Sequence, residues 1–238
     1  MIVEQYPFYH IVIDDFFPID VAESLSNEFI NYNDDRWVYY NNPIENKKTL
    51  NDWRFFPKHI YQTFTHFCSD TFVKHLQEMT GIQKLYPDYG LHGGGCHMHG
   101  VNGVLNVHKD YSLHPKLNLQ RKLNLIVYLS KDWDTSWGGG LELWSHDEQT
   151  DQPKTKVKEV ECIFNRAVIF DTTQNSWHGL PNPLSCPVDM YRKSLAMYYM
   201  IDPVEGVDPR QRALFAPTEA QKGNTDIEKL IENRKKFS

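Results

Sequence analysis

His108 and Asp110 stand two positions apart and are the first residues in this sequence whose types and spacing suggest chemistry. They end a β-type run, residues 104–107, and on a strand such a pair leaves the same face, so both side chains can bind one metal ion. A third ligand must come from elsewhere, and His178 is the best candidate. Two histidines and one carboxylate suit Fe(II) and leave positions open for other ligands. The pattern predicts a metal centre.

A second histidine pair competes for this role. His97 and His99 also share one face of a strand, although no carboxylate accompanies them, and such residues more often form a pocket wall. His-x-Asp alone is also a common chance pattern. The glycines before His97 do not indicate a phosphate-binding loop, because no Gly-Lys-Ser/Thr follows them.

Arg192 and Ser194 form a further same-face pair, on a predicted strand at residues 191–200. A guanidinium matches a carboxylate with two parallel hydrogen bonds, and a nearby hydroxyl can add a third. An arginine on a strand surface is the plainer interpretation. The position on the strand after His178 favours an anion-binding role.

The composition limits the function classes. The formal net charge is −6 with no long basic block, which argues against non-specific nucleic-acid binding. No apolar run approaches the ~20 residues that a membrane helix needs, and the start of the chain lacks the features of a signal peptide. Four scattered cysteines predict reduced thiols and a cytoplasmic protein. The 238 residues suffice for one large domain or for two small ones.

The elements that must position these residues begin with a predicted strand and three helices. Asp20 with Glu23 has the spacing of a capping box, and Gly81 is suited to ending a helix. The expected ranges are 10–17 for the strand and about 20–32, 59–68 and 69–80 for the helices.

Residues 34–57 differ from their surroundings, because aromatic side chains flank a polar centre at residues 41–49. We expect an irregular loop whose centre is mobile and closes over a bound substrate. The alternative is that the aromatic side chains only anchor a surface excursion to the core.

From Pro87 onward, short β-type segments alternate with Gly, Pro and Asn. Strands are expected at residues 122–130, 141–144 and 191–200, a hairpin at 162–170 with its turn at Asn165 and Arg166, and a solvated segment at 145–158. The pattern predicts a mainly β protein with flanking helices.

The order of these motifs resembles one family. Gly-x-Leu-x-x-His108-x-Asp110, Arg-x-Leu-Asn-Leu-x-x-Tyr128-Leu, Trp-Gly-Gly-x-Leu-Glu-Leu, His178-Gly and Arg192-x-Ser194 are similar to motifs of the prolyl-4-hydroxylase-like branch of the 2-oxoglutarate/Fe(II) dioxygenases. The resemblance covers about residues 90–202 and extends to the strand and helix at 10–32.

This resemblance implies a double-stranded β-helix, or jelly roll, with helices beside it. It also implies one dioxygenase domain, residues 1–238. Its expected parts are a helical support at about 1–85, the jelly-roll core at about 86–202 and a carboxy-terminal extension at 203–238.

The resemblance also assigns roles to residues. His108, Asp110 and His178 would bind Fe(II), and Arg192 would pair with the C5 carboxylate of 2-oxoglutarate. Further co-substrate residues would be Ser194, Tyr128, Ile126 and Leu141. One departure is that collagen-type prolyl hydroxylases have Lys where this chain has Arg192, which leaves a prolyl substrate open.

The implied reaction is hydroxylation of an unactivated C–H bond with O₂ and 2-oxoglutarate, releasing succinate and CO₂, with ascorbate as a further factor. Asp110 favours hydroxylation, because related halogenases lack this carboxylate. The substrate is a prolyl or other residue of a protein or peptide, a free amino acid or a small molecule. Nucleic-acid and membrane partners are not expected, and the oligomeric state stays open. The alternatives are a non-catalytic jelly-roll metal-binding module and a zinc metallohydrolase.

Overall fold

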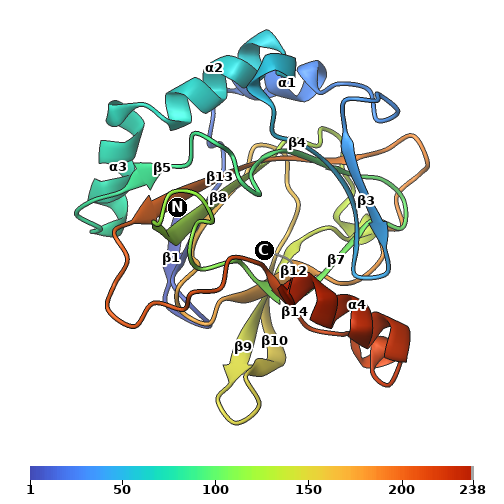
Figure 1. Ribbon diagram of the computed structural model, residues 1–238. Coiled ribbons are helices and arrows are strands. Elements are labelled where there is room, and N and C mark those ends of the chain that lie inside the picture. Colours follow the sequence, from blue (N-terminus) through green and yellow to red (C-terminus); the bar gives the residue numbers. More distant parts are fainter. Residues whose placement is uncertain (237–238) are drawn as a thin grey trace.

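The computed structural model describes residues 1–236, which form a mainly β structure with helices around its outside (Figure 1). The strands are β1 (Ile2–Glu4), β2 (His10–Ile13), β3 (Val38–Asn42), β4 (Glu45–Leu50), β5 (Tyr86–Pro87), β6 (Gly95–His99), β7 (Val104–Lys109), β8 (Gln120–Tyr128), β9 (Leu141–Asp147), β10 (Gln152–Val160), β11 (Ala167–Asp171), β12 (Trp177–Leu180), β13 (Arg192–Ile201) and β14 (Leu214–Phe215). The helices are α1 (Ile19–Glu28), α2 (Lys58–Phe67), α3 (Asp70–Thr80) and α4 (Thr225–Lys236), with short 3₁₀ turns η1 (Trp53–Phe55), η2 (Thr135–Trp137) and η3 (Glu219–Gln221).

The strands form one antiparallel sheet that curls around the centre of the molecule (Figure 1). Its order is β1-β2-β11-β8-β13-β6-β4-β7-β12-β9-β10. Strand β4 lies between β6 and β7 and so connects the two halves of the curl. The expected jelly-roll fold is confirmed.

Alternation along β8 and β13 separates the hydrophobic core from the interior of the curl. Leu123, Leu125 and Met197 belong to the main core, together with Leu25 of α1 and Phe64 of α2. The intervening positions of both strands line a pocket instead. Successive side chains on a strand point to opposite faces, so the same two strands serve stability and the site.

The helix predictions hold for α2 and α3 within one or two residues. At the start of α3, the Ser69 side chain accepts a hydrogen bond from the amide of Phe72, and Gly81 ends the helix at φ 73°. The expected capping box of α1 is wrong. Its N-cap is Pro18, no side chain caps it, and the helix ends at Glu28. Proline fixes its own φ, which makes it suitable for this position.

The expectations for residues 162–170 and for residues 34–57 are also wrong. Residues 162–170 do not form a hairpin, because β11 pairs with β2 and β8 whereas β10 pairs with β9. Asn165 does turn the chain at φ 62°, but its side chain bonds to the backbone of Phe17, which joins the turn to the amino-terminal segment.

Residues 34–57 are not an irregular loop. Strands β3 and β4 form a hairpin at residues 38–50, and Ile44 at its turn is fully buried. Side chains alternate along β4, so that Glu45, Lys47 and Thr49 line the pocket, while the ammonium of Lys48 bonds to the carbonyl of Tyr32. The flanking aromatic Trp37 is buried in the core, as the alternative interpretation expected.

The carboxy-terminal segment returns to the sheet. Strand β14 pairs with β7, and α4 lies beside β14 (Figure 1). Ile231 of α4 packs against Ile44 and Phe215. No helix among residues 1–236 combines the length and the apolar character required to span a bilayer.

Candidate active site

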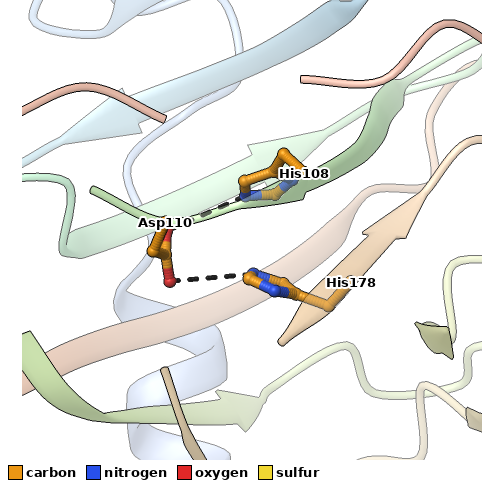
Figure 2. A group of neighbouring side chains, drawn as sticks. All are labelled: His108, Asp110 and His178. Carbon is orange, nitrogen blue, oxygen red and sulfur yellow. Dashed lines mark ion pairs between the residues drawn. The ribbon is translucent and has the colours of Figure 1, made fainter. Parts of the chain in front are cut away.

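Three side chains meet inside the curl of the sheet: His108 on β7, Asp110 directly after it and His178 on β12 (Figure 2). Nε2 of His108 lies 3.8 Å from Oδ1 of Asp110, and Nε2 of His178 lies 3.7 Å from Oδ2. One ligand atom from each residue falls within 4.8 Å of the others, and all three residues are buried. The histidines are cross-strand partners on β7 and β12, so the sheet itself sets their spacing.

Backbone carbonyls orient both imidazoles. Nδ1 of His108 lies 2.9 Å from the carbonyl oxygen of Asn106, and Nδ1 of His178 lies 2.8 Å from that of Ser176. A carbonyl only accepts, so each Nδ1 carries the proton and each Nε2 offers its lone pair to the cluster. Burial, followed by the charge of His178, lowers the pKa of His108 to about 3, so this imidazole is neutral near pH 7.

Asp110 is fixed by groups on β8 and β13. Its Oδ1 lies 3.2 Å from Nη1 of Arg121 and accepts a 3.2 Å hydrogen bond from the hydroxyl of Tyr198. The Asn124 amide donates a longer bond, 3.5 Å, to Oδ2. Burial alone would raise the pKa of this carboxyl, but the neighbouring groups, Arg121 foremost, together lower it to about 2. The group is therefore an anion facing two neutral imidazoles.

Arg121 is itself held by two aromatic rings and a backbone carbonyl. Its guanidinium carbon lies 3.3 Å from the ring centroids of both Tyr111 and Tyr198, and Nη2 donates to the carbonyl of His92 at 2.6 Å. Only 2% of the residue is exposed. A guanidinium stacked between two rings keeps one orientation, and it passes that constraint to Asp110.

The backbone is closely packed next to His178, the third residue of the cluster. A Cβ atom at Gly179 would lie 2.8 Å from the carbonyl oxygen of Leu105 and 2.9 Å from that of Asn106. The register between β12 and β7 shifts at this point. The absence of a side chain at residue 179 lets β12 approach β7 closely enough to pair His178 with His108.

Arg192 lies deeper in the same pocket, on β13. Its Nε donates to the carbonyl of Gly139 at 2.6 Å and its Nη1 lies 3.4 Å from Oγ of Ser194, as expected from their shared face. The residue is buried, and no carboxylate pairs with it among residues 1–236. A buried cation without a counter-charge is costly, so this position fits an anionic ligand.

His97 and His99 lie in this pocket but outside the metal cluster. Nε2 of His97 and both ring nitrogens of His99 are buried without a hydrogen-bond partner among the described residues. Burial, with the charges of Lys47 and Arg192, lowers both pKa values well below the usual range. His99 is the cross-strand partner of Arg192 and has both ring nitrogens free within residues 1–236, so its neutral ring can donate to an anion that Arg192 binds.

The remaining predicted residues divide into two groups. Ile126 and Leu141 line the pocket, whose volume is about 310 Å³. Tyr128 is fully buried behind it, with its hydroxyl 3.4 Å from the carbonyl of Val160 and its ring centroid 4.9 Å from the guanidinium carbon of Arg192. Burial raises the pKa of Tyr128 to about 12, so its phenol stays protonated.

The structure adds residues that the sequence patterns did not identify. The ring of Phe215 stacks on His108 at 5.1 Å between centroids, and Lys47, Arg212 and Arg234 also line the pocket. Three of these come from the carboxy-terminal segment, whose pairing with β7 no local pattern predicts. Arg121 could have been noticed, because it begins the Arg-x-Leu-Asn-Leu motif.

Comparison with known sequences agrees with this geometry. Residues 94–200 match the 2OG-Fe(II) oxygenase superfamily. The chain is 28% identical over 186 residues to prolyl 3-hydroxylase OGFOD1 of Mus musculus, and 26% identical over 185 residues to that of Xenopus laevis. These matches cover 75% and 77% of this chain, but only 30% and 33% of those proteins. The chain thus spans about a third of the length of these curated relatives.

Solved structures show the same fold. A prolyl hydroxylase of Trichoplax adhaerens, in complex with a hypoxia-inducible-factor peptide, matches 80% of this chain and 83% of its own with a TM-score of 0.58 and 16% identity. A prolyl-4-hydroxylase of Pseudomonas putida matches 81% of this chain and 92% of its own with a TM-score of 0.56 and 16% identity. HygX of Streptomyces hygroscopicus, with nickel, 2-oxoglutarate and hygromycin B bound, matches 81% and 82% with a TM-score of 0.55 and 14% identity. The sequence matches bear out the resemblance to the 2-oxoglutarate/Fe(II) oxygenase superfamily, and these structures show that the fold is prolyl-4-hydroxylase-like.

Proposed function

We propose, from the premise that residues 94–200 of this chain are a 2OG-Fe(II) oxygenase core, that the protein is a 2-oxoglutarate- and Fe(II)-dependent hydroxylase. The observation that carries the proposal is the pairing of two features in one pocket. These are the buried cluster of His108, Asp110 and His178, and a buried Arg192 with no carboxylate partner within residues 1–236.

The residues present fit both groups that the family implies. Two unprotonated Nε2 atoms and one carboxylate suit Fe(II) and leave the pocket side open. Arg192, with Ser194 and the imidazole of His99, suits the C5 carboxylate of 2-oxoglutarate. When bound, Fe(II) and 2-oxoglutarate supply the oxidation, in which O₂ places one oxygen on a C–H carbon and yields succinate and CO₂.

The protein's own contribution is positioning and shielding. Arg121 and Tyr198 hold Oδ1 of Asp110, which leaves Oδ2 as the oxygen freer to bind the metal. Ile126 and Leu141 give the co-substrate slot apolar walls. Such walls exclude water from the site, which strengthens the charged contacts within it.

The alternatives fit less well. A zinc hydrolase needs a base beside its metal-bound water, and apart from Asp110 the pocket lining offers only Glu45 among the described carboxylates. Glu45 already pairs with Lys47 and Arg234. A structural metal-binding module gives no reason for the buried Arg192.

The test is release of succinate from 2-oxoglutarate in the presence of Fe(II). We expect turnover that requires both, and loss of that turnover in His108→Ala. The matched control is His75→Ala, because His75 is exposed on α3 and should be replaceable. Hydrolysis that needs zinc and ignores 2-oxoglutarate would instead support the metallohydrolase.

The substrate class, the effect of ascorbate and the cellular location are also part of this proposal. A peptidyl substrate, prolyl or other, is supported by the two OGFOD1 relatives and the peptide-bound neighbour. HygX holds hygromycin B on the same fold, so fold alone does not select a peptide. Stimulation by ascorbate and a cytoplasmic location stay predictions.

A further inference from the structure

The charge of the pocket opposes that of the chain. The formal net charge of the protein is −6. The pocket nevertheless has more basic than acidic side chains in its lining, since Glu45 and Asp110 stand against Lys47, Arg121, Arg192, Arg212 and Arg234. A cleft lined mainly by one sign of charge concentrates ligands of the other sign.

Some of these cations already have partners or roles. Arg121 pairs with Asp110, and Arg192 is assigned to 2-oxoglutarate by the proposed function. Arg234 pairs with Glu45, and its guanidinium carbon lies 5.5 Å from the ring centroid of Phe215. Fe(II) and doubly charged 2-oxoglutarate carry opposite charges of equal size, so binding both would leave the excess positive charge in place.

Lys47 is the first cation that is only partly neutralised, because it shares its carboxylate partner with Arg234. It lies on β4 with its ammonium 3.2 Å from a carboxylate oxygen of Glu45, and its side chain is only 12% exposed. Glu45 must serve Arg234 as well, so one carboxylate faces two cations. Lys47 lines the same pocket as His108, Asp110 and His178.

Arg212 is the second cation of the pocket that remains available to a ligand. It precedes β14, is exposed, and its side chain has no ion-pair or hydrogen-bond partner among residues 1–236. Arg212 and Lys47 come from different walls of the pocket, one from the carboxy-terminal segment and the other from the β3–β4 hairpin. A ligand that contacts both must reach two walls of the pocket.

We propose that the substrate is an acidic peptide segment whose carboxylates contact Lys47 and Arg212 while the carbon to be hydroxylated faces the cluster of His108, Asp110 and His178. This inference rests on the proposed function and names its substrate class. A peptide is favoured over a nucleic acid because the excess cations lie at one pocket, whereas single-stranded nucleic acids require a basic groove that follows the backbone.

The experiment uses three fluorescent peptide libraries with every residue type at the centre and flanking positions enriched in Glu, Gln or Lys. Binding to the full chain loaded with Mn(II) and N-oxalylglycine, an unreactive analogue of 2-oxoglutarate, is measured by anisotropy at low and high salt. Hydroxylation with Fe(II) and 2-oxoglutarate is measured by mass spectrometry. We expect at least tenfold tighter binding of the Glu library than of the Gln library, falling with salt, and the weakest binding for the Lys library.

Variants assign the effect to residues. Lys47→Gln and Arg212→Gln should each reduce the preference for Glu about five- to tenfold. Lys229→Gln removes the same charge from an exposed position of α4 outside the pocket and should keep the preference. Arg212→Lys should restore most of it.

Several results would overturn the proposal. They are equal binding of the Glu and Gln libraries, no binding by any library, stronger competition by a mixed-sequence oligonucleotide, or variants whose main effect is a higher requirement for 2-oxoglutarate. The anisotropy measurement involves no turnover, so it decides the substrate class even if succinate release fails and the proposed function with it.

Discussion

Asp110 is held in place by other side chains before any metal binds. Oδ1 takes the contacts from Arg121 and Tyr198, so that the carboxylate is already turned toward the histidines. Removing such an orienting partner of a ligand typically costs ten- to a hundredfold in metal affinity.

We therefore expect Arg121→Lys to weaken Mn(II) binding by about one to two orders of magnitude, because an ammonium cannot both stack between two rings and reach the carboxylate. The measurement is a Mn(II) titration followed by electron paramagnetic resonance. Arg166→Lys is the matched control, since Arg166 pairs with Asp14 outside this pocket. Unchanged affinity at residue 121 would show that Tyr198 and Asn124 suffice to hold Asp110.

Substitution of Arg192 tests the expected 2-oxoglutarate site. Arg192→Ala should leave Mn(II) binding in place but weaken 2-oxoglutarate binding by about 1.5–3 kcal/mol or more, roughly tenfold to over a hundredfold, because a charge-assisted pair is lost. Calorimetric titration of the Mn(II)-loaded protein measures this. Ser194→Ala, which removes only a 3.4 Å contact, should have the smaller effect. An unchanged affinity for Arg192→Ala would locate the carboxylate site elsewhere.

Among the secondary-structure elements, β4 is a strand that the sequence patterns did not predict. Its residues, Glu45 to Leu50, are mostly of types depleted in strands, and the pattern carries no apolar alternation. What makes it a strand is hydrogen bonding to β3 on one side and to β6 and β7 on the other. Such pairing between distant segments cannot be seen in a local window. The strands bearing His108 and Arg192 were predictable, because their own residues are β-branched or apolar.

This correction changes what proteolysis should show. An irregular mobile loop would be cut by trypsin after Lys47 or Lys48. In the paired strand we expect both bonds to resist, because a protease needs an extended, unpaired segment. Lys116, exposed in a turn, should be cut first. Intact-mass measurement during limited digestion gives the order of cuts, and early cleavage after Lys47 would return this hairpin to the role of a mobile lid.

At the scale of the whole molecule, the amino-terminal helices and the jelly roll share one core. Phe64 of α2 and Leu25 of α1 are fully buried in the same cluster as Leu125 and Met197 of the sheet. The resemblance extended to the strand and helix at 10–32 and implied flanking helices, but it did not indicate that the helices share this core. Nor did it indicate that the carboxy-terminal segment completes the pocket. We propose that residues 1–238 fold as one domain.

Phe64→Ala tests this proposal. Loss of a fully buried phenylalanine costs about 3–5 kcal/mol. Because the core is shared, the melting midpoints from far-ultraviolet circular dichroism and from tryptophan emission should fall together. Trp37 belongs to this core whereas Trp177 belongs to a separate cluster of the jelly roll, so emission reports on both regions. Two separate midpoints would show that the helices and the jelly roll unfold as distinct units.

Gly179 contributes no side-chain atom to the pocket, yet the space around it admits none. If every position of the chain were varied in a library and survivors were selected for hydroxylation, substitutions at residue 179 should vanish about as fully as those at His178. A map of the tolerated substitutions would then group Gly179, which takes no part in the reaction, with the residues that do. The two kinds of position could be told apart only by measuring whether the metal still binds when a side chain at residue 179 separates β12 from β7. At this point of the fold, evolutionary constraint would record distance between backbones and not reactivity.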